Sequence, residues 1–155
     1  MNEVWNLERI YKGFDDPQWS ADFDAMGKKV AEIAAFAKTL QDAEPIQGLC
    51  TGIRLQEELS HLVGKLAGYA SLRSATNTRD SEANSRMGQI MQLYNGVAAP
   101  FAAWKDWASK LPNLLELVDG NEDLRCYSFL FKNLSESSRF LLPGIGETVM
   151  ARLRL

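Results

Sequence analysis

Glu58 and His61 are the two residues of this chain whose types and spacing come nearest to a metal-binding pattern. Glu-x-x-His on one helix face occurs in di-iron helical bundles, which need two such motifs and two further carboxylates. A zinc protease helix needs His-Glu-x-x-His. Because His61 is the sole histidine of the 155 residues, neither ligand set can be completed. We therefore predict a surface or boundary histidine that binds no metal.

The other residues that could do chemistry form no catalytic arrangement in the sequence. A Ser-His-Asp or Cys-His arrangement would have to recruit the one histidine, and the surroundings of Ser60, Cys50 and Cys126 give no sign of an activated nucleophile. The Gly-Ile-Gly of residues 144–146 is too short for a phosphate-binding loop. The sequence predicts no catalytic residue, no metal ligand and no cofactor-binding residue in this chain.

Apolar residues recur at steps of three and four along most of the chain, which is typical of amphipathic helices. Any functional side chain is therefore expected to be positioned by helices. Asp16-Pro17 and Pro45 are helix-start signals, and Asp80 and Asn121 are expected to cap helices. Pro100 is expected to kink a helix or to leave a carbonyl unpaired. The spacing predicts an N-terminal arm at 1–15 and helices at about 17–42, 45–73, 81–110, 122–138 and 146–155.

The pattern contains no credible strand, so the predicted fold class is all-α. Residues 1–155 are expected to form a single helical domain, an antiparallel bundle of long helices joined by short turns. Gly64 and Gly68 lie one turn apart on the second helix, although glycine costs a helix about 1 kcal/mol relative to alanine. They could be tolerated poor helix formers. We favour the hypothesis that a neighbouring helix approaches the backbone there too closely for a side chain.

Charge and targeting signals bound the location and partners of the protein. The net charge is −3, and no segment gathers lysine and arginine into the stripe that nucleic acid or an anionic membrane would require. The chain starts without a basic segment followed by an apolar one, and no apolar run approaches the roughly 20 residues that span a bilayer. We expect a cytoplasmic protein in which Cys50 and Cys126 are reduced and buried.

Two blocks of sequence resemble the oligoendopeptidase F family of zinc metallopeptidases. The opening W-x-L-x-x-I-Y followed by F-D-D is similar to the start of that family, and here it comprises Trp5, Leu7, Ile10, Tyr11, Phe14, Asp15 and Asp16. The second block, YASLRSATNTRD at 69–80, resembles the family's Tyr-x-x-Leu followed by a polar turn. Asn77 stands where the family usually has aspartate. The helix order between and after the blocks is also similar.

The resemblance covers essentially the whole chain but only the N-terminal helical part of such enzymes. It implies a parent enzyme that hydrolyses short peptides in a closed helical cavity, with zinc on a His-Glu-x-x-His helix located well downstream. This chain would then be a truncated piece, inactive alone: a non-catalytic lobe that covers the peptide-binding cleft. Trp5, Leu7 and Tyr11 would anchor the arm on the lobe, while Trp19 and Phe23 begin its first long helix.

The resemblance also suggests partners. The remainder of the parent peptidase would meet the polar turn at 74–80 and its neighbours, so the candidate interdomain residues are Tyr69, Arg73, Asn77 and Asp80. An oligopeptide would bind only in the full-length enzyme. The apolar residues Val149, Met150, Leu153 and Leu155 would lie on a partly unsupported helix, so self-association is expected. The alternative is a stand-alone helical bundle that serves as an interaction or regulatory module.

Overall fold

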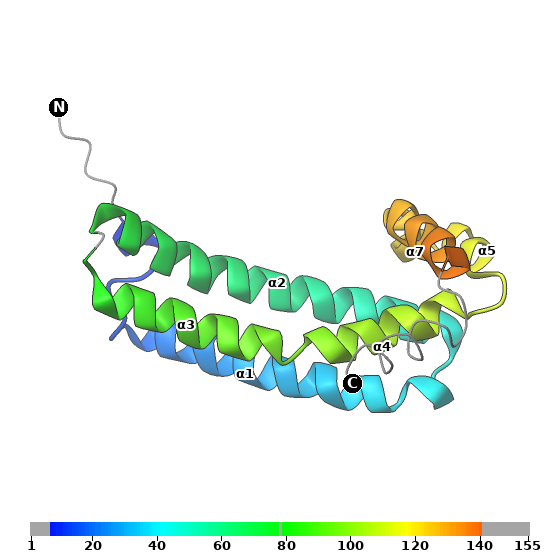
Figure 1. Ribbon diagram of the computed structural model, residues 1–155, viewed down its shortest axis with the longest axis horizontal. Helices are drawn as coiled ribbons and strands as arrows, with labels where there is room; N and C mark the ends of the chain where they lie inside the picture. The colour runs from blue at the N-terminus through cyan, green and yellow to red at the C-terminus, as the bar shows by residue number, and fades with distance from the viewer. Residues whose placement is uncertain (1–6, 78, 141–155) are drawn as a thin grey trace, which may run out of the picture.

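The computed structural model describes residues 7–77 and 79–140 of the chain, with side chains as far as Ser137. Every regular element in these residues is helical, which confirms the all-α class. Three rods lie side by side in alternating directions: α1 (Pro17–Lys38), α2 (Pro45–Thr76) and the consecutive helices α3 (Ser81–Asn95) and α4 (Ala98–Ser109) (Figure 1). The short helices α5 (Leu114–Asp119), α6 (Glu122–Arg125) and α7 (Ser128–Phe140) gather beyond α4 at one end.

The helix starts follow the predicted capping residues. The Asp16 carboxylate accepts a hydrogen bond of 2.9 Å from the backbone N–H of Gln18, and Pro17 begins α1. Asp80 accepts one of 3.0 Å from Ala83 at the start of α3. Asn121 caps α6 through the N–H groups of the second and third residues that follow it. Each acceptor satisfies a backbone donor that the helix itself leaves unpaired, which is why these side chains fix the starts.

Several predicted boundaries need correction. The helix predicted at 17–42 ends at Lys38, and a 3₁₀ turn, Leu40–Asp42, follows it. The helix predicted at 45–73 continues to Thr76. Leu114–Asp119, which lies between two predicted helices, forms α5, and the helix predicted at 122–138 is divided into α6 and α7. The helix predicted at 146–155 lies outside the described residues.

The helix predicted at 81–110 is broken at Gly96 and Val97 rather than kinked at Pro100. Pro100 is the third residue of α4, and the first turn of a helix has N–H groups without intrahelical partners. The first hydrogen bond of α4 joins the backbone N–H of Phe101 to the carbonyl oxygen of Val97, at 3.0 Å. Proline therefore occupies a position where its missing donor costs nothing.

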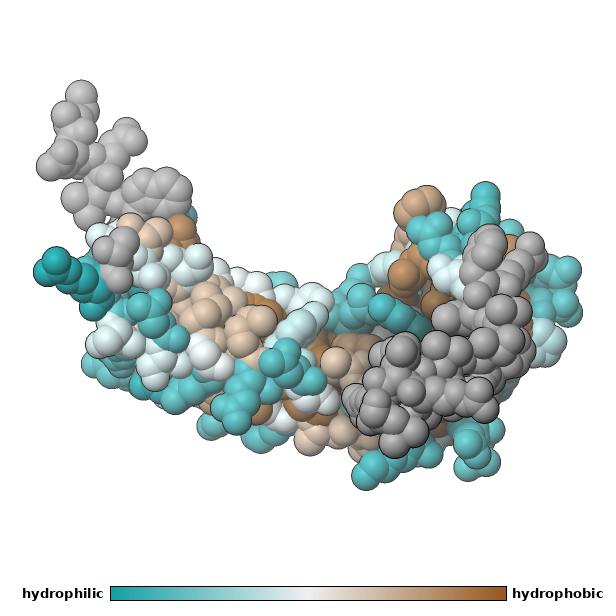
Figure 2. Space-filling view, in the orientation of Figure 1, coloured by the Kyte–Doolittle hydropathy of each residue, from teal (hydrophilic) through white to brown (hydrophobic). Residues whose placement is uncertain are grey.

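The described core consists of two apolar clusters, one toward each end of the rods. The arm-end cluster joins α1, α2 and α3, and its buried members include Trp19, Leu59 and Ile90. The far-end cluster joins α2 and α4 to the short helices, around Trp104 and Phe131. Phe36 and Phe101 pack against both clusters. In the space-filling view, α5 and α7 rise above the rods, so the surface is hollowed over α2 (Figure 2).

The hypothesis of close helix packing at Gly64 and Gly68 is wrong. A Cβ atom at either position would have nothing within 4 Å beyond its own helix backbone. The close approaches on α2 are at Gly48 and Gly52 instead. A Cβ at Gly52 would lie 2.1 Å from the indole ring of Trp104, and one at Gly48 would lie 2.4 Å from that of Trp107.

Two predicted features fall outside the described residues. They are the docking of Trp5 and the apolar face formed by Val149, Met150, Leu153 and Leu155. Self-association through that face stays a prediction, and light scattering over a wide concentration range tests it. Among the helices of residues 7–77 and 79–140, none is both long enough and apolar enough to cross a bilayer.

Candidate functional site

An aromatic cluster joins the N-terminal arm to the two longest helices. Its members, called here the arm cluster, are Tyr11, Phe14, Trp19 and Tyr69. Tyr11 and Phe14 each place their ring centroids 5.2 Å from that of Tyr69, nearly perpendicular to it. Trp19 meets the same two rings at 5.1 and 4.8 Å. Edge-to-face pairs of this kind add to the free energy of burial, so the arm is held on α1 and α2.

Charged groups surround one side of the arm cluster. The hydroxyl of Tyr11 donates a hydrogen bond of 2.6 Å to Asp22, and the ammonium of Lys65 donates one of 2.5 Å to the same carboxylate oxygen. Burial, and then the hydrogen bond that Tyr11 donates to Asp22, raise the pKa of Tyr11 well above its ordinary value. Burial alone would raise the pKa of Asp22, but the hydrogen bonds from Lys65, Tyr11 and Gln18 lower it by more. The pair therefore keeps a neutral phenol against a charged carboxylate.

The predicted interdomain residues lie on the other side of the arm cluster. The guanidinium of Arg73 lies 5.2 Å from the centre of the Phe14 ring and donates to Asp80 at 3.0 Å. The N–H of Ala83 and then Arg73 hold the pKa of Asp80 below its usual value. Tyr69 is 2% exposed, so its ring serves the core of this domain and is not available to a partner. Asn77 is exposed at the end of α2.

The histidine and the two thiols are placed apart from the arm cluster. His61 is exposed on α2, as predicted. Cys50 is partly buried, and burial raises the pKa of its thiol. Cys126 is exposed, which corrects the expectation that both thiols are buried. Both cysteines are free and line the same shallow pocket between α2 and α6. Within residues 7–77 and 79–140, no three His, Cys, Asp or Glu side chains come together in a metal-binding group.

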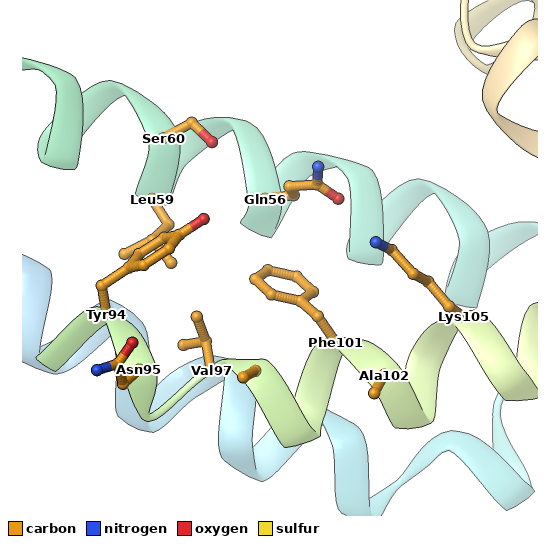
Figure 3. Close-up of a pocket in the computed structure, with 10 residues that line it drawn as sticks. Gln56, Leu59, Ser60, Tyr94, Asn95, Val97, Phe101, Ala102 and Lys105 are labelled. Carbon is orange, nitrogen blue, oxygen red and sulfur yellow. The ribbon is translucent and has the colours of Figure 1, made fainter. Parts of the chain in front are cut away.

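A pocket of about 330 Å³ lies between α2 and the break that separates α3 from α4 (Figure 3). Its polar lining residues are Gln56, Ser60, Tyr94, Asn95 and Lys105. Its apolar floor includes Leu59, Val97 and Phe101. The carbonyl oxygen of the Gln56 side chain, Oε1, is buried and has no hydrogen-bond partner among the described atoms. Because this oxygen is buried, a molecule in the pocket does not reach it, and the accessible lining is an apolar floor with the exposed Lys105 beside it.

Sequence reasoning did not identify this pocket. Tyr94 follows the apolar spacing of Met87 and Ile90, which predicts burial on one helix face, yet its side chain is 40% exposed. The helix break beside the pocket lies at Gly96 and Val97, whereas the sequence predicted a kink or an unpaired carbonyl at Pro100. Nothing in the sequence around Gln56 distinguishes it from a solvated helix residue. The residues that the sequence singled out, at 69, 73, 77 and 80, lie elsewhere, beside the arm cluster.

Comparisons of this chain with models of protein families, with curated proteins and with solved structures find no match.

Proposed function

We propose that this chain is the N-terminal helical domain of an oligoendopeptidase F-like zinc metallopeptidase. In this proposal it forms a lobe that covers the peptide-binding cleft and contributes no catalytic residue. The parent reaction is hydrolysis of short peptides in the cytoplasm. The partners are the remainder of the peptidase and, in the full-length enzyme, an oligopeptide.

The observation that carries the proposal is the contact between the two blocks of the resemblance. Tyr11 and Phe14 come from the first block, and Tyr69 and Arg73 come from the second. In the folded chain these four side chains pack against one another in and beside the arm cluster. Blocks that a family keeps for one structural purpose are expected to meet in this way. A generic hydrophobic arm would make the same contact, and it differs from the family interpretation in what lies beyond the chain.

The donor set of the chain excludes the zinc centre from this domain. The family's zinc helix needs two histidines and a glutamate, and His61 is the one histidine here. Glu58, the nearest carboxylate in the motif, already accepts hydrogen bonds from Lys29 at 2.6 Å and from Arg54 at 3.0 Å. The residues present do not fit zinc, so the proposal derives no catalytic step in this chain.

The interdomain contact in this proposal is formed by Arg73, Asn77 and Asp80. These residues surround the end of α2, where Asn77 is exposed and Arg73 and Asp80 are partly exposed. Tyr69 would act indirectly, because its hydroxyl accepts a hydrogen bond of 3.4 Å from Arg73 and so orients the guanidinium. Asn77→Ser keeps a side-chain acceptor for the backbone N–H of Arg79, so in the full-length enzyme it should change turnover without changing the stability of this domain. Unchanged turnover would remove Asn77 from the contact.

The experiment that tests the proposal begins with the gene. The reading frame is followed past the codon for Leu155, and a downstream His-Glu-x-x-His is expected. The encoded full-length protein should then bind zinc and cleave internally quenched peptides, while the purified 155-residue chain should do neither. Stoichiometric zinc or peptide hydrolysis in the purified chain would overturn the proposal. A control purification carried out without the chain must show no hydrolysis, so that contaminating peptidases are excluded.

The second candidate is a stand-alone helical interaction module, and Phe129 is the observation that favours it. Its side chain on α7 is 75% exposed, and large exposed aromatic rings are typical of binding surfaces. A natural stop codon directly after Leu155 would favour this candidate over the first. Cell fractionation tests the cytoplasmic location that both candidates share.

A further inference from the structure

We propose that Asn95 is a site of spontaneous covalent modification, at which the side-chain amide is lost and an aspartate or an isoaspartate is formed. The site lies at the break between α3 and α4. It is independent of the peptidase assignment, because the reaction needs only this chain and water. Asn95-Gly96 is the one Asn-Gly pair of the sequence. The inference combines this pair with the exposure of the amide, the end of α3 and the packing of the residues that follow.

The reaction requires a nucleophile beside the amide, and the backbone nitrogen of Gly96 provides it. This nitrogen loses its proton and bonds to Cγ of Asn95, while the bond from Cγ to the side-chain nitrogen breaks and ammonia leaves. Water then opens the resulting five-membered succinimide at either carbonyl group. Opening at one carbonyl gives aspartate, and opening at the other gives isoaspartate, in which the main chain passes through Cβ. Asparagine is a chemically labile residue, and glycine places no Cβ in the path of the attacking nitrogen.

The amide of Asn95 is accessible and unrestrained. Asn95 and Gly96 are both exposed, and in the close-up the amide points away from the Phe101 ring (Figure 3). In the part of the chain that the structure describes, no hydrogen bond holds this amide, whereas the side chains of Asn77 and Asn84 both accept hydrogen bonds. The amide of Asn95 is therefore free to rotate toward the backbone nitrogen that follows it.

The backbone at this point can open locally. Asn95 is the last residue of α3, and the N–H of Gly96 donates one of the closing hydrogen bonds, 3.0 Å to the carbonyl oxygen of Leu93. This bond has the spacing of a 3₁₀ turn, whose hydrogen-bond geometry is poorer than that of an α-helix, and helix ends fray. Once the bond breaks, the Gly96 nitrogen can approach Cγ of Asn95. We therefore expect the folded chain to react, more slowly than the unfolded chain.

The products affect the fold because the residues after Asn95 are packed. Val97 is 2% exposed, and a Cβ on Gly96 would lie 3.3 Å from Val30 on α1. Isoaspartate lengthens the main chain by one carbon atom directly before this contact, so either α3 or Val97 must shift. Aspartate keeps the chain length but puts a negative charge at the C-terminal end of α3, where the helix dipole disfavours it. Both products are expected to melt at a lower temperature than the unmodified chain, isoaspartate by more.

Incubation of the purified 155-residue chain in warm, mildly alkaline buffer tests the proposal. Ion exchange follows the gain of a negative charge, and peptide mass spectrometry locates the residue that has changed from an amide to an acid. Asn95 is expected to convert before Asn84, which serine follows. A parallel sample unfolded in guanidinium chloride gives the rate without the helix. Native conversion should be within about a hundredfold of that rate, because opening a helix end costs little free energy.

Two outcomes of this incubation would overturn the proposal. The first is conversion of Asn84 before Asn95 in the folded chain. The second is native conversion of Asn95 that is more than about a thousandfold slower than in guanidinium chloride, which would mean that the end of α3 does not open locally. The acidic fraction, separated by ion exchange, should also melt below the unmodified chain. An unchanged melting temperature would overturn the inferred effect on the packing of Val97.

Two variants separate the succinimide route from other causes of acidic charge. Asn95→Gln would have to form a six-membered ring, which closes much more slowly, so its charge should stay constant during the same incubation. The matched control Asn84→Gln should convert at Asn95 as the wild type does. Both positions are exposed, and circular dichroism verifies that the variants fold. Acidic forms that accumulate equally in Asn95→Gln would overturn the proposal. Neither zinc nor a peptide enters these measurements, so the peptidase assignment can fail without affecting the result.

Discussion

The indole Nε1 of Trp104 donates a hydrogen bond of 3.1 Å to the backbone carbonyl oxygen of Gly48, across the interface between α4 and α2. Trp104 is 1% exposed, and a buried indole needs such an acceptor. Gly48 and Gly52 make the contact possible, because a side chain at either position would occupy space that Trp107 or Trp104 fills. The packing of the far-end cluster thus depends on two glycines of α2 and two tryptophans of α4.

Gly52→Ala is therefore expected to destabilise the fold. The new Cβ would lie 2.1 Å from a rigid indole ring, and overpacking of this kind costs about 1–3 kcal/mol. Gly64→Ala is the matched control on the same helix, where a Cβ meets nothing within 4 Å. That change should stabilise the chain by about 0.5–1 kcal/mol, since alanine is the better helix former. Urea denaturation of both variants measures the difference, and a Gly52→Ala variant as stable as the wild type would contradict the described contact.

Gln56→Met is expected to raise the free energy of unfolding. The substitution removes a buried acceptor without a partner and keeps nearly the same side-chain volume, for a gain of about 1 kcal/mol or more. Gln92→Met on the exposed face of α3 is the control and should change stability by less than about 0.5 kcal/mol. Thermal melts followed by circular dichroism compare the two. A loss of stability in Gln56→Met would show that Oε1 has a donor after all.

Asp22 should make the stability of the chain fall in acid. Its pKa in the folded chain is below the ordinary value of 3.8, so the unfolded chain binds the proton more tightly. The stabilisation is present above about pH 4 and is lost as the pH falls through the lower, folded pKa. Asp22→Asn should cost about 1.5–3 kcal/mol near neutral pH, the worth of hydrogen bonds to a charged group, and much less near pH 2.

Asp24→Asn, on the same helix but exposed, is the control for this acid effect. Its difference from the wild type should stay small throughout the titration. Denaturation curves measured between about pH 2 and pH 7 give both differences. A constant difference between Asp22→Asn and the wild type at every pH would mean that the carboxylate charge is not what stabilises the contact with Lys65 and Tyr11.

Phe131 and Phe129 differ by two positions on α7 but should respond oppositely to truncation. Phe131 is fully buried in the far-end cluster, with its ring centroid 6.2 Å from that of Trp104, so Phe131→Ala should cost about 3–5 kcal/mol. Phe129→Ala removes a side chain that is 75% exposed and should cost less than about 0.5 kcal/mol. Similar losses in both variants would contradict the orientation of α7.

The sequence predicted the elements whose signals are local. Asp16-Pro17, Pro45, Asp80 and Asn121 fix helix starts through hydrogen bonds or ring geometry within a few residues, and helices begin beside each of them. The break at Gly96 was missed because Val97 and Phe101 continue the apolar spacing across it. The kink predicted at Pro100 does not occur, because a proline in the first turn of a helix removes an N–H group that has no intrahelical partner.

The features that were missed depend on partners distant in sequence. Gly48 and Gly52 have the same spacing of four as Gly64 and Gly68, so sequence alone cannot distinguish the packed pair from the exposed one. The difference comes from Trp104 and Trp107 on α4, which pack against Gly52 and Gly48 but not against Gly64 or Gly68. The same holds for Gln56, whose burial depends on the surrounding helices and not on its neighbours in the chain.

Phe36 and Phe101 have a consequence for cooperativity, because within the described residues they are the side chains that pack on both apolar clusters. The segment from α5 to α7 is attached to the rods through the far-end cluster, and folded chains open locally in cooperative units whose free energies of opening differ. We therefore expect Phe36 and Phe101 to couple local unfolding of the far-end cluster to local unfolding of the arm-end cluster. Native-state hydrogen exchange would resolve α7 as a separate opening unit once either ring is trimmed to alanine.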